Sequence, residues 1–105
     1  MANFVLLYSG GAMGASEAEQ AEIMQAWGAW FGKLGSTLVD GGNPFAPAAK
    51  RIASDGKVSD VPASTMATGY SIIQADSLSD AVEMAKGCPN LQGGQVSVYE
   101  TFPVM

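Results

Sequence analysis

The chain has 105 residues, 48% of them hydrophobic and 14% charged, which suffices for a single domain, residues 1–105, with one modest core. It has no histidine and one cysteine, Cys88, so histidine-dependent catalytic pairs, histidine-ligated zinc and intrachain disulfide bonds are excluded. Ten acidic and five basic residues give a net charge of −5, and the basic residues are dispersed, which argues against nucleic acid or an anionic membrane as a partner.

The expected location is the cytoplasm. A single cysteine suits a reducing compartment, and no apolar stretch approaches the roughly 18 residues that span a bilayer. Residues 1–4 show no basic segment followed by a long apolar run, so no signal peptide is expected. No metal site is expected, because the chain has no histidine and only one cysteine, and no cofactor is expected either.

The first half of the chain predicts a strand, a helix and a second strand. Residues 4–8 form an apolar run that stops at glycines. Ser16 and Glu19 have the spacing of a capping box that begins a helix, and Gly35 is placed to end it. The apolar residues of this helix recur at helical spacing and are Ile23, Trp27, Trp30, Phe31 and Leu34. A short strand follows over residues 37–40.

Residues 9–14, between the first strand and the helix, have the spacing of a dinucleotide-binding fingerprint, with serine at its first position. Two residues and the capping box separate this segment from the helix, so a phosphate bound there would not meet the helix N-terminus directly. The chain is also too short for two mononucleotide-binding halves. The segment is therefore interpreted as a loop.

The second half predicts a hairpin, a strand, a helix and a final strand. Residues 50–58 read as a small hairpin with a two-residue turn at Asp55 and Gly56. A strand over residues 69–75 precedes a second cap pair, Ser77 and Asp80. The predicted buried stripe of the second helix comprises Leu78, Ala81, Val82 and Ala85. The last strand is expected over residues 95–102.

This element order predicts an α+β fold of the ferredoxin-like split βαβ type, with an inserted hairpin and two helices on one face of an antiparallel sheet. Residues 4–8 and 70–75 are apolar on both faces of their strands. Two helices cover only one face of a sheet, so the other face needs a partner. The simplest partner is a second copy packed sheet to sheet, which would close a barrel, and we therefore expect a homodimer.

Two charged residues are candidates for chemistry. Asp40 ends a strand beside two glycines, where partial desolvation would make its carboxylate a usable general base, or where it serves as a turn residue that accepts loop N–H groups. Arg51 is the only arginine and hence the only possible bidentate clamp for a carboxylate or phosphate, unless it is simply a solvent-facing charge on an edge hairpin.

Aromatic residues supply the candidate ligand-binding group. Trp27 and Trp30 are about 60° apart on the helical wheel, so one could border a pocket while the other packs inward. Tyr8 and Tyr70 come from two strands expected to be neighbours and could place their hydroxyls in one cavity. These hydroxyls would either bind a ligand or belong to core residues whose polar end contacts water. Met66 would add a flexible apolar wall or fill a gap.

Several segments resemble the YCII-related domain family: residues 43–45, the stretch GYSIIQADSLSDAVEMAKGCP at 69–89, the glycine pair 93–94 and residues 98–100. The resemblance implies the dimeric α+β barrel fold. It also implies, where members act as enzymes, a histidine–aspartate pair that acts on a small, often aromatic molecule. This chain has no histidine to supply that pair. At residues 60–63 it has Asp-Val-Pro-Ala in the position of the family's Asp-Gly-Pro-Phe signature.

Two functions follow as hypotheses. The first is a homodimer that binds a small, aromatic molecule in a barrel pocket lined by Tyr8, Trp27, Met66 and Tyr70, with Arg51 as a further ligand-binding candidate and without the histidine–aspartate pair. The alternative is a cofactor-free lyase, isomerase or monooxygenase-like enzyme, in which Asp40 is the base and a tyrosine hydroxyl polarises the substrate.

Overall fold

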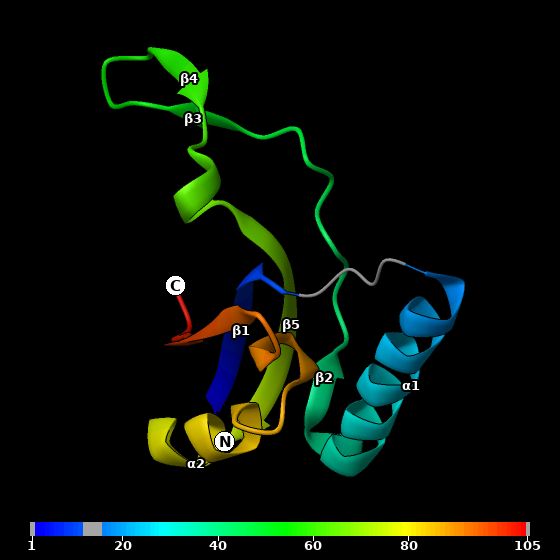
Figure 1. Ribbon diagram of the computed structural model, residues 1–105. Helices are drawn as coiled ribbons and strands as arrows, with labels where there is room; N and C mark the ends of the chain where they lie inside the picture. Colours follow the sequence, from blue (N-terminus) through cyan, green and yellow to red (C-terminus); the bar gives the residue numbers. More distant parts are fainter. Residues whose placement is uncertain (1, 12–15, 105) are drawn as a thin grey trace.

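The computed structural model describes residues 2–11 and 16–104 as an α+β fold (Figure 1). Its strands and helices are, in chain order, β1 (Ala2–Gly10), α1 (Glu17–Leu34), β2 (Leu38–Asp40), β3 (Lys50–Ile52), β4 (Val58–Asp60), β5 (Ala67–Ala75), α2 (Leu78–Ala85) and β6 (Gly94–Glu100). Three short 3₁₀ turns connect them. None of the described helices has the length and apolarity needed to cross a membrane.

Four strands form one antiparallel sheet in the order β2-β5-β1-β6, and β3 pairs with β4 in a separate two-stranded sheet. This is the strand order of two interleaved βαβ units, as the sequence predicts. β1 and β5 pair along nearly their whole nine-residue lengths, with Val5 opposite Ile72 and Leu7 opposite Tyr70. β6 then lies on the other side of β1.

The predicted helix ends are confirmed. The Ser16 hydroxyl accepts a hydrogen bond from the backbone N–H of Glu19 at 3.2 Å, and α1 starts at the next residue after Ser16. Gly35 ends α1 with a positive φ of 55°, and its N–H donates to the carbonyl of Phe31. At the start of α2, Ser77 accepts from the N–H of Asp80 at 3.1 Å.

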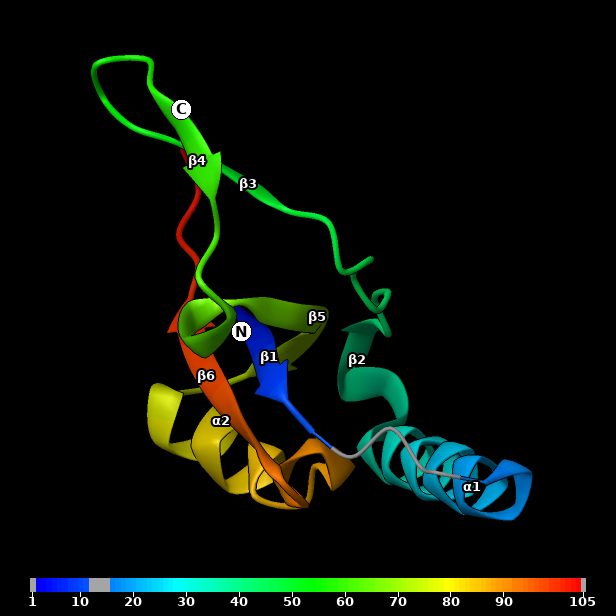
Figure 2. The ribbon, with the colours of Figure 1, turned by 45° about the horizontal axis from the view of Figure 1, so that its top comes forward.

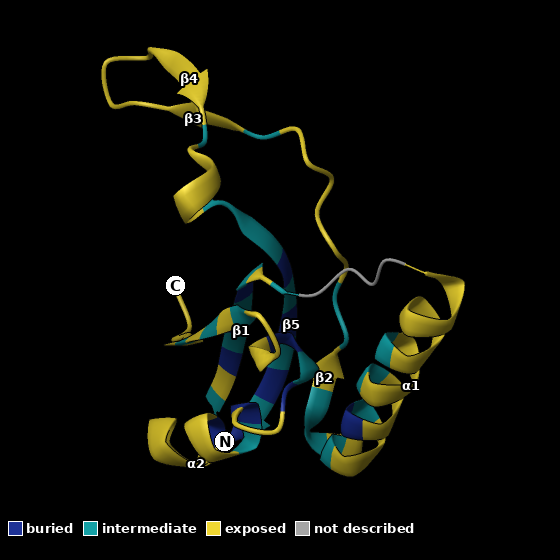
Figure 3. Ribbon diagram, in the orientation of Figure 1, coloured by how far each residue is buried: buried dark blue, intermediate teal, exposed yellow. Residues whose placement is uncertain are grey.

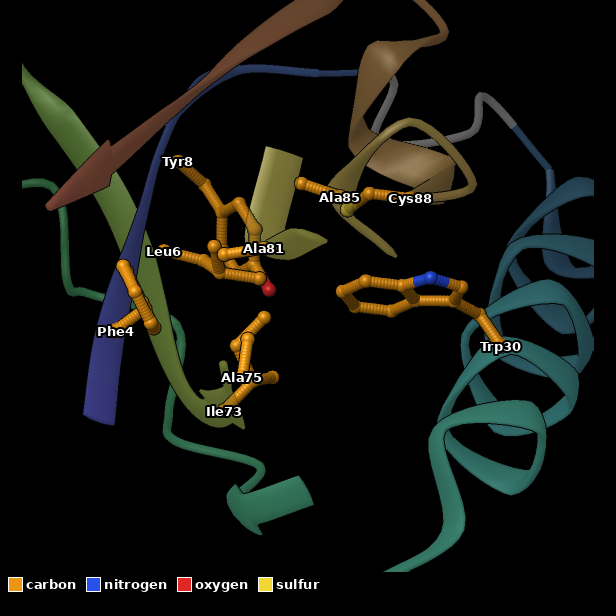
Figure 4. Close-up of a cluster of buried hydrophobic side chains, with 9 residues drawn as sticks. All are labelled: Phe4, Leu6, Tyr8, Trp30, Ile73, Ala75, Ala81, Ala85 and Cys88. Atoms are coloured by element: carbon orange, nitrogen blue, oxygen red, sulfur yellow. The ribbon is translucent and has the colours of Figure 1, made fainter. Parts of the chain in front are cut away.

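The core lies on one face of the sheet, where alternate residues of β1 and β5 are buried (Figure 3). Its buried hydrophobic residues are Phe4, Leu6, Tyr8, Trp30, Ile73, Ala75, Ala81, Ala85 and Cys88 (Figure 4). Because α1 contributes Trp30 and α2 contributes Ala81 and Ala85 to this one cluster, both helices lie on the same side of the sheet. The opposite face carries Val5, Leu7, Tyr70 and Ile72, which are only partly buried.

The predicted stripe of α2 is only half buried. Ala81 and Ala85 are buried, whereas Leu78 and Val82 are exposed. The reason is that α2 packs on the sheet through its small residues, which leaves the larger side chains at the flanks of the contact. The last strand also ends two residues before the predicted position, at Glu100.

The hairpin β3–β4 forms as predicted, but the prediction of a two-residue turn is wrong. Ala53 donates its N–H to the carbonyl of Lys57 at 2.8 Å, so the loop holds three residues, 54–56. Only Gly56 has a positive φ, of 87°, whereas a two-residue Asp-Gly turn would need one at Asp55 as well. The Asp55 carboxylate instead accepts the N–H of Lys57 at 2.9 Å, which fixes the longer loop.

The molecule is less compact than is usual for its length, because the hairpin projects from the sheet and α1 lies beside the sheet (Figures 1 and 2). The radius of gyration is 15.2 Å, against about 13 Å for a compact domain of this size. The accessible surface is 7283 Å², whereas a compact monomer of this mass is expected to expose about 5,500 Å². The excess is therefore about 1,700 Å².

Candidate functional site

A cavity of about 690 Å³ lies between α1 and the sheet. It forms because α1 is buried only at Trp30, in its C-terminal half, while the N-terminal half stands away from the strands (Figures 1 and 2). Four residues of α1 give the cavity an apolar wall: Ile23, Met24, Trp27 and Phe31. The strands β1 and β5 supply Tyr8, Gly69 and Tyr70 among others, and the segment of residues 41–44 that follows β2 also lines the cavity, as does Asn90.

Of the two tryptophans of α1, Trp30 packs inward and Trp27 borders the cavity, which are the two positions that the helical wheel allows. Trp30 is buried in the core, and its indole N–H donates to the carbonyl of Met84 at 3.2 Å, which ties α1 to α2 (Figure 4). Trp27 lines the cavity and is half-buried. Its ring contacts Tyr8 edge-on at 5.1 Å between centroids, and Phe31 at 5.7 Å. The cavity thus has a wall of aromatic rings that contact one another.

Glycine is required at the turn after β2, where the backbone lies against β5. Gly42 has a φ of +74°, and a Cβ built there would lie 1.7 Å from the carbonyl oxygen of Tyr70. Gly41 lies next to Phe31, whose ring would be 3.5 Å from a Cβ at that position. This segment of the cavity wall was not predicted from the sequence, although the two consecutive glycines after a strand were a signal for it.

The Tyr8 hydroxyl is part of a buried chain of hydrogen bonds. It donates to the Ser71 hydroxyl at 2.8 Å, and Ser71 donates in turn to the carbonyl of Gly41 at 2.7 Å. Burial raises the pKa of Tyr8 well above its ordinary value, and burial also raises the pKa of the neighbouring Cys88 thiol. Tyr8 is therefore a neutral residue whose hydroxyl proton already forms a hydrogen bond with Ser71. Its ring, rather than its hydroxyl, is what it offers to a ligand.

The polar residues of the cavity are uncharged. No Asp, Glu, Lys or Arg is found among the described residues that line it, and those with polar side chains include Tyr8, Gln20, Asn43, Thr68 and Asn90. Tyr70 also borders the cavity, although strand alternation places its side chain on the other face of the sheet. Asn90 is buried and donates to the carbonyls of Ser9 and Gln95 at 3.2 and 2.8 Å, so it joins the ends of β1 and β6. Within residues 2–11 and 16–104 there is no group of three or more side chains suited to hold a metal ion.

Asp40 is exposed at the end of β2, and it is not among the described residues of the cavity wall. Its carboxylate accepts the N–H of Gly42 at 2.8 Å. This is the turn geometry that the sequence left open as the alternative to a general base. The side chain therefore shapes the glycine turn that borders the cavity.

The structure does not bring Arg51 and Met66 to the cavity with Tyr8, Trp27 and Tyr70. Arg51 lies on β3 and is exposed, and its guanidinium reaches the Thr65 hydroxyl at 3.5 Å. Met66 precedes β5 and is half-buried. Residues 12–14 of the glycine segment lie outside the described residues.

No protein-family model matches this chain, and neither does any curated protein.

Proposed function

We propose that the protein is a homodimer of the dimeric α+β barrel type, similar to YCII-related proteins, that binds a small, uncharged, aromatic molecule between α1 and the sheet. The observation that carries the proposal is a 690 Å³ cavity with an aromatic wall and no charged residue among its described lining. Its volume is within the range of about 300–1,000 Å³ that is typical of small-molecule sites.

The aromatic wall favours a planar ligand. Trp27 and Phe31 come from consecutive turns of α1, and a ring placed in the cavity would meet them edge-on or offset. Such ring pairs add about 0.5–1.5 kcal/mol each beyond the burial of their surface. A charged ligand would find no counter-ion among the described lining residues, and the desolvation of its charge would be uncompensated.

Dimerisation is supported by the other face of the sheet. Val5, Leu7, Tyr70 and Ile72 occupy that face in two adjacent strands, and both helices lie on the opposite side. The excess accessible surface, about 1,700 Å² for one copy, is comparable with the roughly 1,000–2,500 Å² that each subunit buries in an obligate homodimer. Sheet-to-sheet packing would then close the barrel on this face.

The ligand site in this proposal differs from the barrel pocket expected from the sequence. Tyr8 and Trp27 lie on the side of the sheet that carries the helices, whereas the barrel would close on the side of Val5 and Leu7. Each copy would therefore hold its own site, and the dimer would hold two.

The test compares two probes of similar size by isothermal titration calorimetry at pH 7, where 2-naphthol is neutral and 2-naphthoate is an anion. We expect 2-naphthol to bind at one site per chain and 2-naphthoate to bind at least about ten-fold more weakly. Trp27→Ala should weaken 2-naphthol binding by about ten-fold or more, because Trp27 lines the cavity.

The matched control is Phe102→Ala, which removes an exposed aromatic ring outside the cavity and should leave the affinity unchanged. Equal binding of the two probes, or equal affinity in wild type and Trp27→Ala, would contradict the proposed site. The dimer is measured separately, by sedimentation velocity.

A further inference from the structure

The hairpin β3–β4 is an arm that the rest of its own chain does not cover. Every residue from 50 to 60 is exposed, and Figures 1 and 3 show the hairpin projecting beyond the four-stranded sheet. The chain enters it after Pro44, which bridges to Gly69, and returns from it into β5. Its base is therefore fixed at the sheet edge, while its strands stand in solvent.

An isolated two-stranded hairpin is marginally stable in water, so a projecting hairpin gains order from a surface that it packs against. The bonds that hold this one are its own ladder, the ion pair between Lys50 and Asp60, and the loop closed by Gly56. One further hydrogen bond, from Arg51 to the Thr65 hydroxyl at 3.5 Å, joins it to the turn that follows β4. The ion pair is exposed on both sides and contributes little.

The two faces of the arm differ in chemistry. Ile52 is opposite Val58 and Arg51 is opposite Ser59, so alternation places Ile52 and Val58 on one face, beside the Lys50–Asp60 ion pair, and Arg51 and Ser59 on the other. Ile52 is 71% exposed and Val58 is 61% exposed. Two β-branched side chains that are paired across a hairpin and open to water form a compact apolar contact surface.

The arm also differs in charge from the rest of the chain. Three of the five basic residues and two of the ten acidic residues lie in residues 50–60, which gives the arm a net charge of +1 and the remainder −6. Three of the five basic residues are thus concentrated on this projection, because positions 50, 51 and 57 are close together in the sequence. The rest of a second copy carries a net charge of −6, which is opposite in sign to the charge of the arm.

We infer that the arm docks on a second copy of this chain, with Ile52 and Val58 facing the partner. The inference rests on the proposed homodimer. The arm lies between β2 and β5 in the chain. Figures 1 and 2 show it projecting away from α2, and hence away from the side of the sheet that carries the helices, so it would extend toward a partner copy packed on the open face. In a two-fold dimer each arm would make the same contact, so two arms would share the interface. The surface that one copy exposes in excess, about 1,700 Å², leaves room for both the sheet face and the arm.

The test is the dimer dissociation constant, measured by sedimentation velocity with the full chain. Ile52→Thr combined with Val58→Thr keeps β-branched residues in the hairpin but removes the apolar contact. We expect this variant to raise the dissociation constant by about 100-fold or more, since two side chains on each of two arms lose apolar burial. The matched control, Arg51→Lys combined with Ser59→Thr, changes the opposite face and keeps the charge, so it should stay within about three-fold of wild type.

Hydrogen exchange supplies a second readout that does not depend on the variants. The amides of β3 and β4 in the wild-type protein should become protected as concentration rises through the dissociation constant. If the Thr variant associates like wild type and these amides exchange fast at every concentration, the arm inference is overturned while the sheet-to-sheet dimer stands. A wild-type protein that is monomeric at every concentration overturns both, and leaves the 2-naphthol site to be judged by calorimetry.

Discussion

Tyr8→Phe separates the two roles that the sequence left open for this residue, a ligand hydrogen bond or a core residue. The substitution removes only the hydroxyl that donates to Ser71, and the ring that contacts Trp27 is retained. Ser71 is fully buried, so its oxygen loses a donor that water does not replace. We expect a loss of about 1–2 kcal/mol in the free energy of unfolding. For a domain of this length the corresponding fall in Tm is about 5–12 °C.

The pH dependence of the same variant has a definite sign. Tyrosine in an unfolded chain loses its proton near a pKa of about 10, whereas burial raises the pKa of Tyr8 in the folded protein. The folded state therefore binds more protons than the unfolded state above that pH, and its stability falls as the pH rises. Tyr8→Phe lacks this contribution, so its stability deficit relative to wild type should be constant below about pH 9 and narrow above about pH 10.

The assay is urea unfolding followed by circular dichroism at pH 7, 9 and 10.5, together with 2-naphthol calorimetry at pH 7. The raised pKa of Cys88 lowers the alkaline stability of both proteins, so the difference between them reports mainly on Tyr8. We expect the variant to bind 2-naphthol within about two-fold of wild type, because the hydroxyl is committed to Ser71. Unchanged stability together with a ten-fold loss of affinity would refute the reasoning and make the hydroxyl a ligand contact.

Three further predictions concern the segments that frame the cavity. Gly42→Ala should lower the free energy of unfolding in urea by at least about 2 kcal/mol, because its Cβ would collide with the Tyr70 carbonyl. Gly28→Ala, which has open space around it in α1, should instead raise the free energy of unfolding by about 0.5–1 kcal/mol. Equal effects of the two substitutions would contradict this account. Asn90→Ala should lower the free energy of unfolding by about 2 kcal/mol, since two bonds to backbone carbonyls are lost; thermal unfolding at the wild-type Tm would show that these bonds matter little. Asp40→Asn should leave both Tm and 2-naphthol affinity unchanged, because the amide oxygen can still accept the Gly42 N–H; a ten-fold loss of affinity in calorimetry would restore a direct role in the site.

Local signals in the sequence predicted the elements of this fold well. Ser16 and Ser77 begin the two helices and Gly35 ends α1, as the sequence predicts, because a cap depends on a few neighbouring residues. The apolar character of both faces of β1 and β5 could also be predicted, because the alternation of side chains is a property of the strand itself. The apolar stripe of α1 was predicted with the right members, of which Trp30 is buried.

The rest of the site depends on contacts between distant segments. Helical spacing says which side of α1 is apolar, but not that its N-terminal half stands away from the sheet and leaves a cavity. Ser71 gave no signal at all, because a serine inside a strand is as common on a wet surface as in a buried hydrogen-bond chain. The hairpin loop was wrong because Asp55 and Gly56 suit two loop lengths, and the bond from Ala53 to Lys57 selects the longer one.

The alternation along β1 separates two kinds of evolutionary change. Phe4, Leu6 and Tyr8 point toward the helices, whereas Val5 and Leu7 lie on the open face. Under the proposed function, a substitution at Tyr8, which lines the cavity, would change ligand binding and leave association unchanged, whereas a substitution at Val5 or Leu7 would have the reverse effect. Among relatives of this chain, adjacent positions of one short strand would then diverge at independent rates, with a period of two residues.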